Sequence, residues 1–389
     1  MSTRVTPDHH LDIDALGVTI RIDVGGLPPV DRELLADAWS GALTTSERTP
    51  AGIVRPRPHF HFDETVADLT TQVTLAALEA RRGQLWMVHA GAVAHEDGRV
   101  ILFSGRSGMG KTTLMSQLAR EFGYVTDESV GVTSDGRVLP YRKPLSVIVD
   151  GARAKRQLSP ETLGLRELPP VPLRLHAIVV LDRHDDGIPA RMEDLDIADA
   201  LEAIAPQCSF LAELEAPLRT MIGHISRAGG AVRLRYREAA DVLTLVGSLF
   251  DTERNAPVTS GGSEPVPRPD PHSGPSHGTT FSRSPVIDAV VLSDERLALL
   301  RRGLDAQTMV HLIGGIGPAL WTAAAECASF DDLVTAAVRA YGRPPSGHAA
   351  EAVQSALDAM VSAGLMELST PRRVREETGQ EGEEGPPDE

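Results

Sequence analysis

The spacing of apolar and polar residues divides the first 250 residues into short strands and helices. Residues 18–22 and 232–236 alternate between apolar and polar side chains, which is typical of strands with one buried face. Residues 177–181 form a continuous apolar run, which predicts a fully buried strand. Asp-Gly pairs at residues 97–98 and 135–136 predict two tight hairpins. The predicted strands are residues 18–22, 86–94, 99–103, 129–132, 137–139, 177–181 and 232–236, and the predicted helices are residues 63–81, 113–120 and 239–250. Strands mixed with helices indicate an α/β domain.

A second, smaller set of elements is predicted after residue 285. Short apolar runs predict three strands, and helical spacing then predicts three helices. Ser329 and Asp331 are both suitable N-caps for the middle helix, and Gly342 and Gly364 lie where helix C-caps belong. The predicted strands are residues 287–292, 297–301 and 309–313, and the predicted helices are residues 318–327, 331–341 and 349–363.

Composition separates these two parts. Residues 251–284 are rich in Pro, Gly and Ser and have almost no apolar side chains, so we expect a disordered linker there. The end of the chain, residues 371–389, is an acidic segment that we expect to be disordered and solvated. The expected organisation is therefore a large α/β domain at residues 1–250, the linker, a small domain at residues 285–370, and the tail.

Charge excludes some classes of partner. The formal net charge is −16, which disfavours binding to the phosphate backbone of DNA or RNA. The two cysteines, Cys208 and Cys327, are far apart and favour neither a disulfide framework nor a zinc site. The N-terminus lacks the apolar run of a signal peptide, and no stretch approaches the roughly 18 apolar residues of a membrane helix. We expect a soluble, cytoplasmic protein that binds neither nucleic acid nor a membrane.

Residues 105–112 fit the phosphate-binding pattern G-x-x-x-x-G-K-[ST] in full. An apolar strand enters this loop and a helix-forming run leaves it, so backbone N–H groups and the helix N-terminus can converge on the β-phosphate. Lys111 can reach the β- and γ-phosphates, and the hydroxyl of Thr112 can ligate magnesium. ATP and Mg²⁺ are the predicted cofactors. The predicted nucleotide-binding residues are Gly105, Arg106, Ser107, Gly108, Met109, Gly110, Lys111, Thr112 and Thr113.

Two adjacent acids follow the helix after this loop. Asp127 and Glu128 end a short apolar strand, and one can hold magnesium while the other takes the proton from an attacking hydroxyl. An ordinary solvated turn explains the same pair equally well. Asp182 is a rival for the magnesium-side acid because it ends the apolar strand at residues 177–181, but its neighbours read as an exposed turn.

The order of His89-Ala90-Gly91, the hairpin, the loop and Val125-Thr126-Asp127-Glu128 resembles the HPr kinase/phosphorylase family. The resemblance is good over about residues 85–145. It implies a P-loop kinase fold in which Asp127 exchanges a proton with the substrate serine. Glu128 matches the second acid of the family, which is there an aspartate, and His89 matches a histidine near the reacting groups. Read alone, His89 would more often be a core residue.

The departures from that family point to a different substrate. The family's separate N-terminal domain and its segment that contacts the carrier protein HPr are not evident, so HPr is not the expected substrate and the reverse, phosphorylase reaction is in doubt. The closer similarity is to short HPr-kinase-like proteins encoded beside ribosomally made, modified peptides. A similar basic, Pro-rich segment there implies that Arg142 and Lys143 neutralise transferring phosphate. An ordinary basic loop is the alternative. Arg153, Lys155 and Arg156 are weaker candidates for the same role.

The second part resembles the PqqD-type peptide-recognition domain, a small winged helix of mixed α and β structure. Three strands precede Ala319-Leu320-Trp321, and the last helix ends in Ala363-Gly364-Leu365. The resemblance implies that a precursor's leader peptide adds as a strand to the third strand and packs its apolar side chains on the last helix. Plain core is the alternative for each residue, and a net charge of −5 over residues 285–370 disfavours DNA. The residues implied are Val310, His311, Leu312, Ile313, Val353, Leu357, Met360 and Val361.

These features together predict an ATP-dependent kinase that phosphorylates a serine hydroxyl of a captured precursor peptide. Its expected catalytic residues are Asp127, His89, Lys111, Arg142 and Lys143, with Thr112 and Glu128 as metal ligands. The rival hypothesis is a nucleotide-regulated peptide chaperone or adaptor that presents the precursor to another modifying enzyme. The kinase family forms hexamers, so the resemblance is also compatible with a homo-oligomer.

Overall fold

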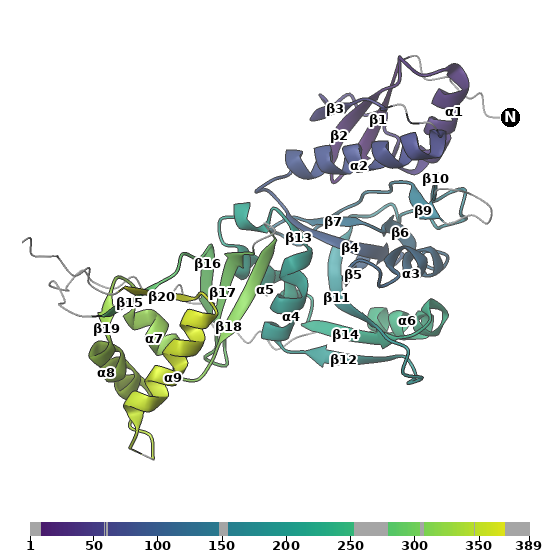
Figure 1. Ribbon diagram of the computed structural model, residues 1–389. Coiled ribbons are helices and arrows are strands. Elements are labelled where there is room, and N and C mark those ends of the chain that lie inside the picture. The colour runs from purple at the N-terminus through teal and green to yellow at the C-terminus, as the bar shows by residue number, and fades with distance from the viewer. Residues whose placement is uncertain are drawn as a thin grey trace, which may run out of the picture. The chain divides into compact units, whose positions relative to one another are not determined.

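The computed structural model describes residues 9–57, 59, 61–147, 155–252, 279–303, 307–345 and 347–369. Most of the predicted linker and the whole predicted tail therefore lie outside the described residues. Those that are described form two compact units, one made of residues up to 252 with residues 286–312, and one made of residues 279–285 with residues 313–369. The first unit is the mixed α/β part in which the phosphate-binding sequence lies (Figure 1).

The first unit begins with a small sheet covered by a helix. Strands β1 (His10–Ala15), β2 (Val18–Asp23) and β3 (Gly52–Val54) form this sheet in the order β1-β2-β3. Helix α2 (Phe62–Ala80) packs on it through Leu69 and Val73, which are fully buried. Helix α1 (Pro29–Ala38) and the short turn η1 (Ser40–Ala42) connect β2 to β3.

A nine-stranded sheet forms the centre of the first unit. Its main path runs β12-β14-β11-β5-β4-β7-β8, and β6 and β13 also pair with β4. The members are β4 (Trp86–Ala94), β5 (Arg99–Ser104), β6 (Gly123–Thr126), β7 (Ser129–Val132), β8 (Val138–Leu139), β11 (Arg174–Arg183), β12 (Arg191–Leu195), β13 (Cys208–Ser209) and β14 (Ala231–Tyr236). Both predicted hairpins, β4–β5 and β7–β8, are confirmed.

Strands β5, β11 and β14 of this sheet are parallel neighbours. Ser104 of β5 lies beside Val180 of β11, and Leu181 lies beside Leu234 of β14. Their carboxyl ends therefore meet at one edge of the sheet, where open α/β sheets bind their ligands. The sequence that leaves β5 at this edge is the glycine-rich loop.

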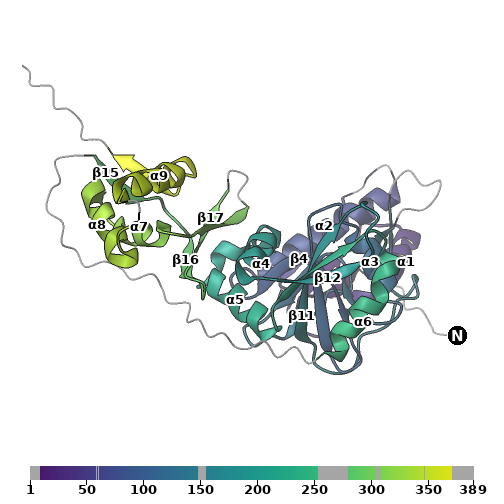
Figure 2. The ribbon, with the colours of Figure 1, turned by 90° about the horizontal axis from the view of Figure 1, so that it is seen from below.

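Helices cover both faces of the sheet because β5 is apolar on both faces. Leu102 packs in a cluster with Leu201 and Met221, and its neighbour Phe103 packs in a second cluster with Leu114. Figure 2 shows α4 (Ile197–Ile204) and α5 (Pro217–Arg227) on one side, and α3 (Lys111–Leu118) and α6 (Leu243–Asp251) on the other. The turns η2 (Ala205–Gln207), η3 (Leu211–Glu213) and η4 (Ala239–Val242) complete the connections.

A two-stranded ribbon that the sequence pattern does not predict lies against α2. Its strands, β9 (Leu145–Val147) and β10 (Arg156–Leu158), are antiparallel, and β10 contacts α2. Only three residues of each strand are paired. It places one more polar surface beside the glycine-rich loop, as described below.

Three strands that we assigned to the second domain belong largely to the first unit. They are β16 (Asp288–Val291), β17 (Leu297–Arg302) and β18 (Thr308–Ile313), in the order β16-β17-β18. The reason is packing, since Val290 and Leu300 join the same apolar cluster as Leu218 of α5. Asp288 also accepts a hydrogen bond from the backbone N–H of Leu218 (3.0 Å). Residues 286–312 thus group with the first unit, whereas the sequence pattern placed them in the second domain.

The second unit consists of three helices and a small sheet. The strands β15 (Thr280–Arg283), β19 (Ala328–Ser329) and β20 (Met366–Ser369) pair in the order β19-β15-β20, and the helices are α7 (Gly317–Ala323), α8 (Phe330–Tyr341) and α9 (Ala349–Ser362). The N-cap prediction for α8 is confirmed for Ser329, which forms a reciprocal capping box with Asp332. Gly342 is the C-cap of α8, as predicted.

In the described part of the chain, none of the helices has the length and apolar content needed to cross a bilayer. Both cysteines are free.

A buried histidine makes the stability of the first unit depend on pH. His224 stacks on Trp86 with 5.1 Å between ring centroids, and burial lowers the pKa of its imidazole from 6.5 to about 4. Between pH 6.5 and pH 4 the unfolded chain therefore binds the proton more readily than the folded chain, so stability falls as the pH falls. We expect this group alone to remove about 3 kcal/mol from the free energy of unfolding over that window.

Urea unfolding at several pH values tests this expectation. His224→Phe keeps an aromatic ring beside Trp86 but cannot bind a proton, so its stability is expected to depend less on pH than that of the wild type. His348→Phe, at an exposed position, is the matched control and is expected to follow the wild type. An identical pH dependence in the wild type and His224→Phe would contradict the assignment.

Candidate functional site

The glycine-rich loop has the backbone that its sequence predicts. Strand β5 ends at Ser104, and helix α3 begins at Lys111. Gly108 and Gly110 adopt positive φ angles of 87° and 80°, which side chains with a Cβ rarely accept. A Cβ on Gly105 would lie 2.9 Å from the Cβ of Leu181 on β11, so glycine is also required for close packing there. The turn that results directs backbone N–H groups and the start of α3 to one point.

Lys111 is held inside this loop. Its Nζ donates to the carbonyl oxygens of Gly105 (2.6 Å) and Arg106 (3.3 Å), and the side chain is buried. Burial lowers the pKa of Lys111, against the attraction of Asp127 and Glu128. The two carbonyl oxygens accept the hydrogen bonds of the Lys111 ammonium group that phosphate oxygens would accept in a nucleotide complex.

Tyr236, the last residue of β14, contacts the glycine-rich loop. This residue was not predicted from the sequence as part of the site. Its hydroxyl, at the end of β14, donates to the carbonyl oxygen of Met109 (2.5 Å). Burial raises the pKa of Tyr236 to about 12, so the hydroxyl keeps its proton and remains a donor. The contact joins residues 127 positions apart, and the only sequence signal was a tyrosine at the end of a predicted strand.

A cavity of about 720 Å³ opens beside the loop. This volume lies in the range of pockets that bind cofactors and small molecules. The cavity contains the sequence-predicted residues Lys111 and Thr112 together with His89, Asp127 and Glu128. The full lining is Ala67, Thr70, Thr71, His89, Ser107, Gly108, Gly110, Lys111, Thr112, Thr113, Ser116, Asp127, Glu128, Lys143, Ser146, Val147, Lys155 and Gln157.

Asp127 is buried in this cavity and held by two partners. Its Oδ1 accepts a hydrogen bond from the hydroxyl of Tyr124 (3.0 Å) and lies 3.2 Å from the Nζ of Lys143. The same Nζ lies 3.1 Å from Oε2 of Glu128 and donates to the carbonyl oxygen of Pro144 (3.0 Å). Asp127 and Glu128 are therefore part of a cavity wall rather than of a solvated turn.

The charges of this group depend on one another. Burial opposes the charge of Lys143, but Asp127 and Glu128 outweigh that cost and raise the pKa of Lys143. Burial, with the nearby charge of Asp127, raises the pKa of Tyr124 well above its usual value, so its hydroxyl is a donor to the carboxylate. Lys143 thus serves as the counter-ion of both acids, a different arrangement from the phosphate contact that the sequence resemblance implied.

His89 lies on β4 at the edge of the same cavity. Burial and the charge of Lys111 lower the pKa of His89, although Glu128 and Asp127 act in the opposite direction. A lowered pKa keeps the imidazole neutral at pH 7, so it can exchange hydrogen bonds with a phosphate or a hydroxyl without carrying a charge.

The donor set at the loop fits magnesium. Thr112 offers a hydroxyl and Glu128 a carboxylate that is only partly buried, and both line the cavity. Mg²⁺ in kinases is usually held by one or two protein oxygens, with phosphate and water oxygens completing six ligands.

Other predicted site residues lie elsewhere. Arg142 is not among the residues that line the cavity, and it donates to Glu161 (2.6 Å). Asp182 pairs with Arg235 (3.3 Å) at the end of β11, and Arg156 lies 3.8 Å from Asp63. Lys155 does line the cavity, Arg106 is exposed, and Arg153 lies outside the described residues.

The residues implied in peptide recognition fall in two units. Val310 is buried and His311 and Leu312 are half-buried in the first unit, where β18 is the last strand of its sheet. The remaining residues belong to the second unit, in which Ile313, Val353, Leu357 and Met360 are buried and Val361 is half-buried.

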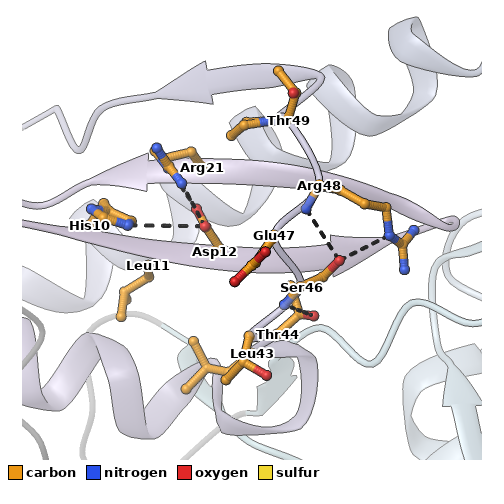
Figure 3. A pocket seen from close by; sticks show the side chains of 12 residues that line it. His10, Leu11, Asp12, Arg21, Leu43, Thr44, Ser46, Glu47, Arg48 and Thr49 are labelled. Atoms are coloured by element: carbon orange, nitrogen blue, oxygen red, sulfur yellow. Dashed lines mark hydrogen bonds and ion pairs between the residues drawn. The ribbon is translucent and has the colours of Figure 1, made fainter.

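A second cavity, of about 620 Å³, lies over the first small sheet (Figure 3). Arg21 forms two hydrogen bonds of 2.7 Å with Asp12, and Arg48 donates to Ser46 and to the carbonyl of Gly17. The two arginines that line this cavity are thus paired within the protein.

Comparison with known proteins adds little to this geometry. No family model matches the chain, and no curated protein matches it. Among solved structures, the HPr(Ser) kinase/phosphatase from Coxiella burnetii matches with 14% identity and a TM-score of 0.24, over 43% of this chain and 95% of that one. The functional argument therefore depends on the site itself.

Proposed function

We propose that this protein is an ATP-dependent phosphotransferase that moves the γ-phosphoryl group to a hydroxyl, namely a serine of a ribosomally made precursor peptide. One observation carries the proposal. Asp127, a buried carboxylate with fixed partners, lies in the same cavity as a complete phosphate-binding loop. A protein that only bound ATP would need the loop but not a positioned base beside it.

The loop and Lys111 bind the phosphates. Backbone N–H groups between Gly105 and Thr112 hold the β-phosphate, and Lys111 exchanges the carbonyls of the loop for phosphate oxygens. Thr112 and Glu128 would hold Mg²⁺, which would neutralise charge on the phosphates. Lys155 has no hydrogen-bond or ion-pair partner in the described part of the chain and supplies a further cation for the transferred group.

Asp127 is the general base. The acceptor oxygen bonds to the γ-phosphorus, the bond between that phosphorus and the β–γ bridging oxygen breaks, and ADP leaves with those electrons. The acceptor's proton passes to Asp127 as the new bond forms. Tyr124 and Lys143 keep the carboxylate oriented through Oδ1. His89, neutral at pH 7, hydrogen-bonds to the acceptor or the transferred phosphate.

The peptide part of the proposal uses strand addition. An extended leader segment would add to the edge of β18, as peptides add to exposed sheet edges. The PqqD-like features of the sequence after residue 313 support this choice of substrate. Because β16 and β17 pack into the core of the first unit, a peptide on β18 would be tethered to the kinase core, which raises its effective concentration there.

Mass spectrometry after incubation with Mg²⁺-ATP and serine-containing peptides tests the proposal. We expect peptides to gain the mass of one phosphate with wild-type protein and not with Lys111→Met. Nucleotide-dependent peptide binding without any phosphorylation of serine would instead support the chaperone or adaptor hypothesis.

A further inference from the structure

The cavity beside the glycine-rich loop has a second wall, formed by residues from outside the loop. Ala67, Thr70 and Thr71 come from α2, and Ser146, Val147, Lys155 and Gln157 come from the β9–β10 ribbon or the residue before it. None of these residues belongs to the loop or to the acid pair. The sequence pattern predicted neither the ribbon nor its place beside the loop.

The register of the ribbon places two of its polar side chains on one face. Gln157 is the cross-strand partner of Ser146, so their side chains share a face. Lys155, the residue before β10, also lines the cavity. The ribbon therefore brings an amide, a hydroxyl and an ammonium group to the cavity, together with the apolar Val147.

Gln157 lines the cavity and carries a buried side-chain oxygen without a hydrogen-bond partner in the described part of the chain. The residue is 8% exposed, and its Nε2 donates to Oγ of Ser146 (2.6 Å). Among the described residues its Oε1 has no hydrogen-bond partner. Because a serine hydroxyl can donate or accept, either orientation of the amide leaves one atom unsatisfied. A buried polar atom without a partner costs free energy, which a bound ligand that hydrogen-bonds to it would recover.

The position of the ribbon indicates which ligand this is. Ser146 follows Lys143 by three residues, and Lys143 contacts Asp127. Gln157 thus lines the same cavity as Asp127, which an acceptor must reach. Phosphates are already served by the loop and the N-terminus of α3.

We infer that Gln157 binds the phosphoryl acceptor by hydrogen-bonding to the peptide unit that carries the acceptor hydroxyl. A peptide unit has both an N–H and a carbonyl, so it satisfies whichever amide atom of Gln157 is unpartnered. The threonines of α2 form the other side of this acceptor subsite. The inference rests on the proposed phosphotransfer and adds to it the residue that selects the acceptor.

Kinetics and binding with Gln157→Leu and Gln157→Met test this subsite. Both changes keep the side-chain volume and remove the amide, and the unbranched Met serves if the Leu variant does not fold. The probe is N-acetyl-L-serine N-methylamide, a single blocked serine unit. Its KM, and its Kd by calorimetry with a non-hydrolysable ATP analogue present, are expected to rise by about 10- to 100-fold. The KM for ATP is expected to stay within about twofold. Gln72→Leu, where the amide bonds to Asp68 on α2 away from the cavity lining, is the matched control.

The possible outcomes test acceptor binding by Gln157 separately from the proposed phosphotransferase activity. An unchanged KM and Kd for the serine probe in both Gln157 variants overturns the inference, as does a wild-type protein that does not bind the probe. A raised KM for ATP with an unchanged KM for the probe assigns Gln157 to the nucleotide and also overturns it. Binding of the probe that depends on Gln157, without any transfer, supports the subsite but overturns the proposed phosphotransferase activity.

Discussion

Asp127→Asn is expected to lower kcat for phosphoryl transfer by about 10²- to 10⁴-fold, the usual contribution of a general base. Asparagine keeps the size of the side chain but cannot take the acceptor's proton. Nucleotide binding is expected to change little, because the phosphates are bound by the loop and Lys111. The measurements are kcat for serine phosphorylation and the Kd for ATP by calorimetry.

Asp182→Asn provides the matched control for this experiment. Asp182 is the rival acid from the sequence, but the structure pairs it with Arg235 at the end of β11. Its replacement is expected to leave kcat within about twofold. Full activity of Asp127→Asn, or a comparable loss in Asp182→Asn, would show that the base has been assigned to the wrong residue.

Lys143→Met is expected to lower the free energy of unfolding by about 3–5 kcal/mol at pH 7, the usual cost of removing one partner from a buried ion pair. The reason is that Lys143 is the counter-ion of two acids, at 3.2 Å from Asp127 and 3.1 Å from Glu128. Without it, Asp127 remains a buried carboxylate whose one other described side-chain partner is the hydroxyl of Tyr124. Urea unfolding measures the loss.

A double variant tests whether the loss comes from the uncompensated charge. Lys143→Met combined with Asp127→Asn removes both charges, so it is expected to recover part of the stability, with a coupling of about 0.5–3 kcal/mol. Lys155→Met, at an exposed lysine of the same cavity, is expected to stay within about 0.5 kcal/mol of the wild type. Wild-type stability in Lys143→Met would refute the role of counter-ion.

The parts of the site that were predictable are local in sequence. The glycine-rich loop needs only eight consecutive residues between a strand and a helix, and the conformations of Gly108 and Gly110 agree with that pattern. The hairpins at β4–β5 and β7–β8 follow from Asp-Gly turns for the same reason. Each of these features depends on neighbours a few residues away, so the sequence contains the whole signal.

The partners of the acids could not be predicted in this way. Arg142 and Lys143 are adjacent and of like charge, yet Arg142 binds Glu161 while Lys143 binds Asp127 and Glu128. Tyr236 reaches the loop from β14, and Gln157 reaches the cavity from a ribbon whose strands are only three residues long. Such contacts depend on how distant segments pack, which no local pattern records.

The sequence by itself determined most strands of the central sheet, its two hairpins and the glycine-rich loop, because periodicity and turn chemistry act over a few residues. Only the tertiary structure decided that Asp127 lines the cavity beside the loop and Asp182 does not, because both follow apolar strands and differ in their partners, Lys143 for Asp127 and Arg235 for Asp182. It also decided that β16 and β17 belong with the first unit, because their apolar face is buried against α5. Burial against a distant segment depends on how the whole chain packs, so the local sequence pattern could not assign these strands to one unit.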